Sequence, residues 1–146
     1  MNYKVSQAVI LMAEDNDADF RLTEEAILES KLTNKVHRAK DGIELMAFLR
    51  KQSPFEYAPT PNIILLDLNM PRMDGREALK EIKSDPALKL IPVVILTTSD
   101  AEVDVLKTYS LNANCYIRKP VDFDRFIDVV KSIENFWFSI VTLPKT

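Results

Sequence analysis

The chain has 146 residues and a formal net charge of −3, with one histidine and one cysteine. That length suits one domain with a sizeable core, and the scattered basic residues argue against direct nucleic-acid binding. His37 and Cys115 alone cannot build a disulfide or a Cys/His cluster, so any metal must be held by oxygen. The apolar runs are far shorter than the roughly 20 residues that span a bilayer, and no signal peptide is present, so we expect a cytoplasmic protein without membrane contact.

Five short apolar runs predict β-strands, and segments of helical period separate them. The runs are residues 8–13, 34–39, 62–67, 92–97 and 114–119. Helical spacing occurs at residues 16–30, 41–52, 76–85, 99–110 and from 121 onward. Strands that alternate with helices predict a parallel sheet covered on both faces. We therefore expect an α/β fold, a flavodoxin-like, doubly wound (βα)5 sheet of five parallel strands in the order 2-1-3-4-5.

We expect a single domain over residues 1–146, with its core at about 7–141 and no output domain. Residues 51–61 contain three prolines and predict a longer surface loop. Gly42 and Gly75 are the two glycines of the chain, so the glycine-rich motifs of dinucleotide-binding and P-loop proteins cannot occur.

Acidic side chains stand where two of the predicted strands end. Glu14 and Asp15 follow the first strand, and Asp67 ends the third. Ligands of open α/β sheets bind beyond the carboxyl ends of the strands, and the first and third strands are neighbours in the expected order, so these carboxylates should converge. Their mutual repulsion calls for a hard dication such as Mg²⁺ and an ammonium group, which Lys119 can supply from the end of the fifth strand.

Four motifs at the strand ends resemble the receiver domain of two-component response regulators. They are "EDN" at 14–16, "LLDLNMPRMDG" at 65–75, "ILTTS" at 95–99 and "YIRKP" at 116–120. The resemblance covers nearly the whole chain from about Val9 onward. It implies a signalling protein that accepts a phosphoryl group from a histidine kinase, and not an enzyme that acts on a separate substrate.

The resemblance assigns the phosphoacceptor role to Asp67. It implies that Mg²⁺ is bound by Glu14, Asp15, Asp67 and the backbone carbonyl of Asn69. Glu14 stands where many receivers have an aspartate, and its longer side chain leaves open whether it reaches the metal directly or through water.

Thr97 and Lys119 match the residues that bind the phosphoryl group in receivers and assist phosphotransfer and autodephosphorylation. Tyr116 matches the aromatic residue that turns inward after phosphorylation, which changes the face formed by the fourth helix, fifth strand and fifth helix. The resemblance also implies a cis peptide bond between Lys119 and Pro120.

The C-terminal segment carries more apolar surface than one core needs. Helical spacing beyond residue 121 predicts a stripe that faces the sheet, formed by Phe123, Phe126, Ile127, Val130, Ile133, Trp137 and Ile140. Val129, Phe136 and Phe138 are left outside this stripe. Such a surplus usually marks a partner surface, so we expect a homodimer or partner contact that uses Phe136, Trp137 and Phe138. A final turn folded back on its own domain would also cover them.

The ending "NFWFSIVTLP" at 135–144, together with the loop at 51–61, resembles the single-domain response regulators of cyanobacterial phytochrome histidine kinases. This resemblance implies a phytochrome-type kinase as the phosphoryl donor. It also implies a dimer joined through the fourth and fifth helices, so that phosphorylation controls dimerisation or partner binding.

Two other classes of protein remain as alternatives. A hydrolase of the haloacid-dehalogenase type also uses a strand-end aspartate, but it normally needs a second aspartate two residues later, where this chain has Asn69. A binding module that keeps the fold without phosphorylation is the other. The complete set of acidic, hydroxyl and lysine residues argues against it.

Overall fold

The computed structural model describes residues 4–5, 7–98, 115–133 and 141–142. Within them, a parallel sheet contains β2 (Ile10–Ala13), β3 (Val36–Ala39), β4 (Ile63–Asp67), β5 (Val93–Thr97) and β6 (Cys115–Arg118). Their order in the sheet is β3-β2-β4-β5-β6. This is the order 2-1-3-4-5 expected from the sequence, and the predicted fold class is confirmed.

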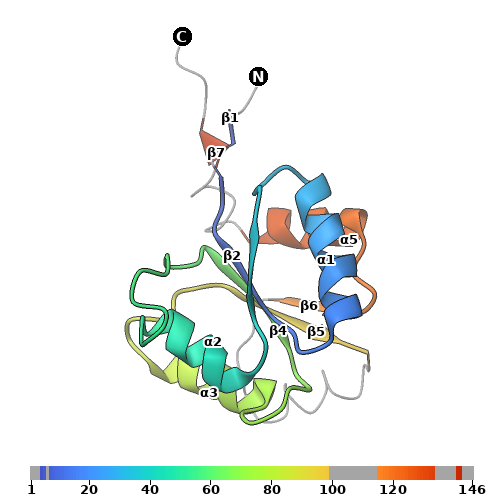
Figure 1. Cartoon of the computed structure of the whole chain (residues 1–146). Helices are drawn as coiled ribbons and strands as arrows, with labels where there is room; N and C mark the ends of the chain where they lie inside the picture. The colour runs from blue at the N-terminus through green and yellow to red at the C-terminus, as the bar shows by residue number, and fades with distance from the viewer. Residues whose placement is uncertain (1–3, 6, 99–114, 134–140, 143–146) are drawn as a thin grey trace.

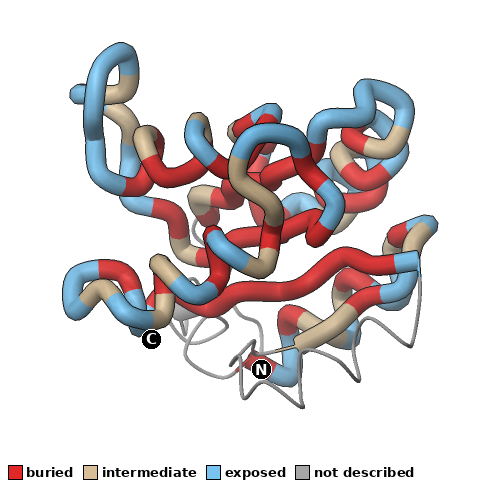
Figure 2. Tube along the Cα trace, turned by 90° about the horizontal axis from the view of Figure 1, so that it is seen from below, coloured by how far each residue is buried: buried red, intermediate tan, exposed pale blue. Residues whose placement is uncertain are grey.

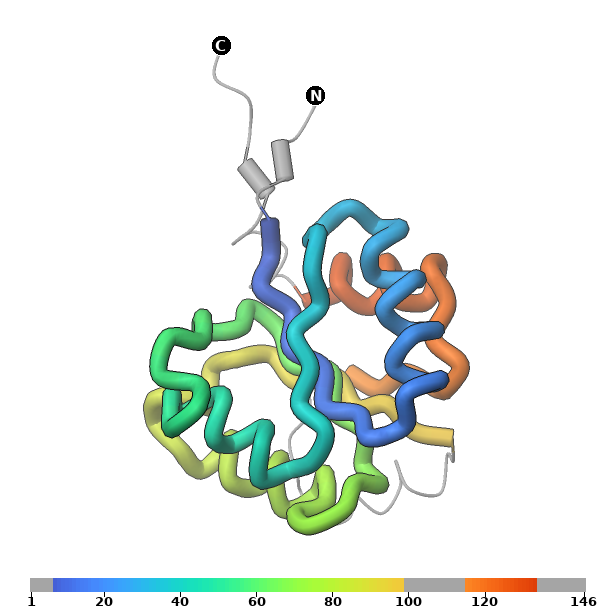
Figure 3. The backbone as a smooth tube through the Cα atoms, in the orientation of Figure 1, coloured from blue at the N-terminus to red at the C-terminus, as the bar shows by residue number. Residues whose placement is uncertain are grey.

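Helices cover both faces of the sheet (Figure 1). α1 (Asp17–Glu29) and α5 (Phe123–Ser132) lie on one face, and α2 (Gly42–Leu49) and α3 (Gly75–Ser84) lie on the other. Figure 3 shows the chain leaving β2 for α1 and returning through β3 to α2 across the sheet. The helix predicted at 99–110 lies outside the described residues. No helix of the described part is both long and apolar enough to cross a membrane.

The central strands β2, β4 and β5 are buried along their whole length because each face of the sheet has its own apolar layer (Figure 2), whereas the edge strands β3 and β6 are partly exposed. Successive strand residues point to opposite faces. In β2, Ile10 belongs to the layer that contains Phe126 of α5, whereas the next residue, Leu11, belongs to the layer that contains Leu79 of α3. Double coverage explains why the sequences of the central strands β2, β4 and β5 are apolar on both faces up to the strand ends.

The C-terminal helix is shorter than its apolar pattern suggests. α5 ends at Ser132, and Phe126, Val130 and Ile133 of the predicted stripe are buried. Val129, which the sequence pattern left outside the core, packs half-buried against the same apolar layer. That expectation was wrong because α5 contacts α1 as well as the sheet and therefore buries a wider stripe. Phe136, Trp137 and Phe138 lie outside the described residues.

A second, smaller pairing joins the two ends of the chain. β1 (Lys4–Val5) pairs antiparallel with β7 (Val141–Thr142), with Lys4 opposite Thr142. This ribbon lies beyond the end of the main sheet at which β2 begins, not beside an edge strand (Figure 1). It was not predicted, because two-residue strands are too short to show an alternating pattern.

Both glycines lie where two backbone segments touch. The Gly42 N–H donates to the Met73 carbonyl at 3.1 Å, and a Cβ at Gly42 would overlap that carbonyl oxygen. A Cβ at Gly75 would lie 2.5 Å from the Asp67 carbonyl oxygen and 2.6 Å from Leu68 Cα. The loop between β4 and α3 therefore approaches its neighbours more closely than any side chain would permit.

We expect Gly42→Ala to lower the free energy of unfolding by about 1–3 kcal/mol, because the added methyl group overpacks the contact with Met73. Helix propensity alone predicts the opposite sign. Urea denaturation measures the change. Ala47→Gly in the same helix is the control and should cost about 1 kcal/mol through propensity. A Gly42→Ala variant more stable than the wild type would contradict the close contact.

Candidate functional site

The carboxyl ends of β2 and β4 bring together the three acidic residues singled out in the sequence. One carboxylate oxygen each from Glu14, Asp15 and Asp67 lies within 4.8 Å of the other two. Strand register explains this convergence: Ala13, the last residue of β2, pairs with Leu66 of β4, so Glu14 and Asp67 come next on adjacent strands.

The three carboxylates differ in their exposure. Glu14 is 0% exposed and Asp67 is 4% exposed, whereas Asp15 is open to solvent. One Asp67 oxygen, Oδ1, accepts a hydrogen bond from the Asn69 N–H at 3.1 Å. Buried carboxylates are costly without compensating positive charge or hydrogen-bond donors, so the partners of Glu14 and Asp67 determine whether they can be ionised.

Lys119 supplies that positive charge. Its Nζ lies 2.5 Å from Glu14 Oε1 and 3.2 Å from Asp67 Oδ2. Its backbone N–H donates to the Thr97 carbonyl at 2.8 Å, which holds the end of β6 against the end of β5. The Lys119–Pro120 peptide is cis, as expected from the resemblance. The structure therefore places Lys119 between two buried carboxylates from adjacent strands.

A third carboxylate, which sequence reasoning missed, also contacts this lysine. Asp19 Oδ2 lies 3.3 Å from Lys119 Nζ. Asp19 belongs to the first turn of α1, behind the N-cap Asn16, whose side chain accepts a hydrogen bond from the Asp19 N–H. The available signal was its position in the first turn of the helix that directly follows Glu14 and Asp15, at the same end of the sheet.

Burial and neighbouring charge shift the pKa values of the central pair. Burial, followed by the hydrogen bond and charge of Asp67, raises the pKa of Glu14 to about 7, although Lys119 acts against the shift. Burial of Lys119 by itself lowers its pKa, but the hydrogen bond that Lys119 donates to Glu14 and the charge of Asp67 outweigh it and raise the pKa. Lys119 is therefore a permanent cation, while Glu14 can exchange a proton near neutral pH.

The other predicted residues lie around this centre. Thr97 ends β5 and is 2% exposed, and its strand neighbours β4 with Leu96 opposite Asp67. Asn69 is exposed in the loop that follows β4. Tyr116 is half-buried on β6 against the α2 and α3 side of the core, and burial raises the pKa of its phenol. Their functional roles remain predictions.

Arg38 is a further residue that the sequence did not reveal. From β3, its Nε donates to the Glu14 carbonyl at 3.0 Å, and its guanidinium pairs with Asp17 at 2.8 Å. The same group lies 4.7 Å from the centroid of the Phe20 ring. Strand β3 places Arg38 beside Met12 of β2, so the guanidinium reaches the loop that carries Glu14. It thereby fixes the backbone of that loop.

The donor set fits a hard divalent cation. Its oxygens come from the carboxylates of Glu14, Asp15 and Asp67, and the Asn69 carbonyl lies in the loop that begins beside Asp67. Mg²⁺ binds through a few carboxylates and usually keeps several waters, and the exposure of Asp15 gives those waters access.

Comparisons with known proteins agree with this geometry. The model of the response regulator receiver domain matches residues 10–131. Response regulator Rcp1 from Synechocystis sp. is 48% identical over 136 residues, which are 93% of this chain and 92% of that protein. Its Mn²⁺-bound crystal structure has 49% identity and a TM-score of 0.73, covering 94% of this chain and 99% of that one.

Two further solved structures are similar. The phosphorylated cyanobacterial phytochrome response regulator RcpA has 48% identity and a TM-score of 0.75, and the match covers 96% of this chain and 100% of that one. The bacteriophytochrome response regulator AtBRR has 34% identity and a TM-score of 0.84, with 97% and 99% coverage.

The raised pKa of Glu14 predicts how stability depends on pH in metal-free protein. Because the folded pKa of about 7 exceeds the ordinary value of 4.5, protonated Glu14 stabilises the fold below pH 4.5, and this contribution is lost as pH rises through 7. We expect a loss of at most about 3 kcal/mol, measured by urea denaturation in chelator. Glu14→Gln should lack this decline. Parallel pH curves for the two proteins would refute the shift.

Proposed function

Because the chain belongs to the family of response regulator receiver domains, we propose that Asp67 accepts a phosphoryl group from a histidine kinase. The observation that supports this role most directly is the surroundings of Asp67: a buried carboxylate with Lys119 at 3.2 Å and two further carboxylates beside it. The phosphorylated state of the relative RcpA supports the same chemistry.

In this reaction an oxygen of the Asp67 carboxylate attacks phosphorus in line. A P–O bond forms, the P–N bond to the donor imidazole breaks, and its electron pair stays with the nitrogen, so the product is an acyl phosphate. The Lys119 ammonium meets the negative charge of the incoming phosphoryl oxygens, and the Thr97 hydroxyl donates a hydrogen bond to them. The same residues assist the later autodephosphorylation, in which a water oxygen attacks phosphorus, the P–O bond to Asp67 breaks, and inorganic phosphate and the free carboxylate are the products.

We assign Mg²⁺ to the oxygens of Glu14, Asp15, Asp67 and the Asn69 carbonyl. When bound, it supplies positive charge that offsets the charge on the phosphoryl oxygens. The Mn²⁺-bound state of Rcp1 supports a divalent cation in this family.

The donor kinase must bring its histidine within bonding distance of Asp67, so it contacts the rim of the site. A shallow pocket on this rim is lined by Asp19, Leu22, Thr23, Lys119, Pro120 and Val121. Leu22 is 54% exposed there, which gives an apolar contact beside the charged site. The similarity to RcpA and AtBRR supports a phytochrome-type kinase as the donor.

The output of phosphorylation is a change in assembly. Phosphoryl oxygens that bind Thr97 and Lys119 draw the end of β5 inward, and Tyr116 on the neighbouring β6 turns with it. This changes the face formed by β6, α5 and the helix predicted at 99–110. That change controls homodimerisation or partner binding, for which Phe136 to Phe138 supply the apolar contact.

Asp67→Asn should abolish phosphorylation, because an amide is not a nucleophile for phosphorus. Intact mass after incubation with Mg²⁺ and either acetyl phosphate or a phosphorylated phytochrome-type kinase measures the gain of one phosphoryl group. Asp85→Asn is the matched control, since asparagine can also accept the hydrogen bond from the Ala87 N–H, and Asp85 follows the end of α3 that lies away from Asp67. Equal phosphorylation of the Asp67→Asn variant would exclude Asp67 as the acceptor.

Lys119→Arg should separate phosphorylation from assembly. The larger guanidinium keeps the charge beside Asp67, so phosphorylation remains possible, but it cannot take the position of the ammonium that draws β5 inward. Size exclusion with and without phosphorylation should show a shift for the wild type and none for Lys119→Arg. Alanine at Phe136, Trp137 and Phe138 should abolish the shift while phosphorylation is retained. Equal shifts in the wild type and the lysine variant would refute the switch.

A further inference from the structure

We propose that Arg72 and Asp41 form a latch that positions the loop between β4 and α3 for metal binding. The latch would act through the backbone carbonyl of Asn69, so it rests on the metal site proposed above. Arg72 belongs to this loop, and Asp41 is the N-cap of α2. Both residues lie outside the set assigned to the metal or to the phosphoryl group, and their role is positioning.

The ion pair has well-defined geometry on both sides. Arg72 Nε and a terminal guanidinium nitrogen lie 2.8 and 2.7 Å from the same oxygen of Asp41, Oδ2. The other oxygen, Oδ1, accepts a hydrogen bond from the Glu44 N–H at 2.8 Å. The Asp41 side chain is only 13% exposed. The Arg72 side chain is 60% exposed, but α2 fixes the carboxylate, so the arginine must adapt to it, and charge-assisted hydrogen bonds of this length are stronger than neutral ones.

The backbone of Arg72 gives an independent indication. Its φ angle is 66°, in the left-handed region that favours glycine and is costly for other residues. A glycine would meet the backbone requirement more easily but would have no side chain for Asp41. The contact with Asp41 thus gives a reason for an arginine at a position whose backbone conformation by itself favours glycine.

Further bonds connect the latch to the site. The Met73 carbonyl, next to Arg72, accepts the Gly42 N–H at 3.1 Å, so two consecutive loop residues are held by the start of α2. The Gly75 N–H closes the loop on the Leu68 carbonyl at 2.9 Å. Asn69 lies between these anchors, and its N–H donates to Asp67 at 3.1 Å. Restraint at Arg72 is thus restraint on the orientation of the Asn69 carbonyl.

Electrostatics and positioning predict opposite effects for loss of Arg72. As a charge, the guanidinium repels a dication at the acidic site, so its removal should tighten metal binding. As a latch, it holds a ligand in place, so its removal should weaken binding. The sign of the change in Mg²⁺ affinity therefore separates the two roles. A change in stability alone would not distinguish them.

The test is the Mg²⁺ affinity measured by titration calorimetry for wild type, Arg72→Ala, Asp41→Asn and the double variant. Asn retains the helix-capping ability of Asp41 but not the ion pair. We expect each single variant to bind Mg²⁺ about tenfold more weakly, at the low end of the effect of residues that orient metal ligands. The double variant, which restores the net charge, should bind about as weakly as either single one, because the latch is lost only once.

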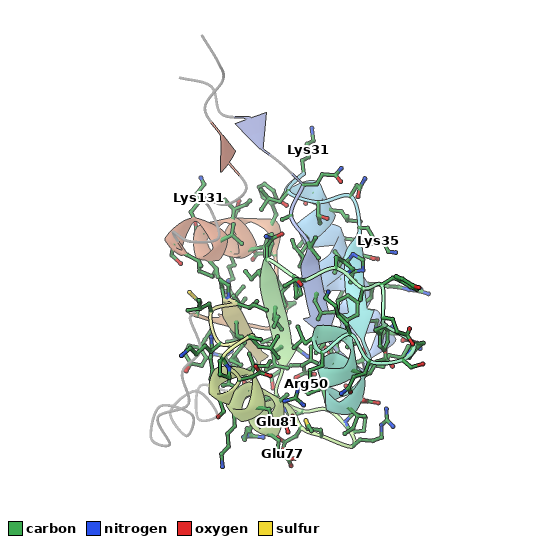
Figure 4. All side chains as sticks on the ribbon, turned by 90° about the vertical axis from the view of Figure 1, so that its left-hand side faces the viewer. Lys31, Lys35, Arg50, Glu77, Glu81 and Lys131 are labelled. Atoms are coloured by element: carbon green, nitrogen blue, oxygen red, sulfur yellow. The ribbon has the colours of Figure 1, made fainter. Side chains whose placement is uncertain are left out.

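Arg50→Ala is the charge-matched control. Arg50 ends 3.8 Å from Glu81 and 3.7 Å from Asp85, where α2 and α3 face each other (Figure 4), and it makes no contact with the loop in the described residues. Arg50→Ala removes one positive charge, as Arg72→Ala does, so we expect unchanged or slightly tighter Mg²⁺ binding. Thermal unfolding of every variant checks that each is folded at the temperature of the titration.

Arg72→Ala protein that binds Mg²⁺ as tightly as the wild type, or more tightly, would overturn the latch. So would a double variant weakened by the product of the two single effects. Wild-type protein that binds no Mg²⁺ would overturn the metal site itself, and the latch with it, whereas phosphorylation of Asp67 would still be measurable by mass.

Discussion

One ammonium group holds together the carboxyl edge of the sheet. Lys119 Nζ lies within 3.3 Å of carboxylates from three elements: Glu14 after β2, Asp67 at the end of β4 and Asp19 on α1. Without this cation the carboxylates would repel one another at close range, and the burial of Glu14 and Asp67 would be very costly. The charged lysine therefore stabilises this edge of the sheet.

The charges at this edge explain why a cation site belongs here. Asp15 adds a fourth carboxylate, so one ammonium leaves a negative excess. The raised pKa of Glu14 is one response of the protein, since a proton on Glu14 reduces that excess. A dication is the other response, and the two compete, because a protonated carboxyl is a poor metal ligand. Protonation of Glu14 and binding of a dication are thus competing ways to reduce the negative charge at this edge of the sheet.

The sequence predicted much of this arrangement, because a carboxylate that ends a continuous apolar run is unusual. Asp67 and Lys119 could be found in this way, since parallel strands bring their carboxyl ends to one edge. Asp19 stood in the first turn of a predicted helix, but its contact with Lys119 depends on how α1 lies over the sheet, and the contacts of Arg38 depend on how far a guanidinium reaches across β3. The backbone of Arg72 was hidden for another reason: a left-handed φ angle leaves no trace when the residue is not glycine. The width of the face that α5 buries, which includes Val129, depends on α1 rather than on the pattern of α5 itself.

The β1–β7 ribbon has a consequence for anything joined to this domain. Because Lys4 pairs with Thr142, groups attached beyond either residue leave from the same point on the surface. That point lies at the edge where β2 begins, whereas Asp67 lies at the opposite edge (Figure 1). A tag, a dye or a fused protein domain at either end therefore stands clear of the rim that a phosphoryl donor must approach. Two probes, one on each end, would report on each other's proximity without touching the site.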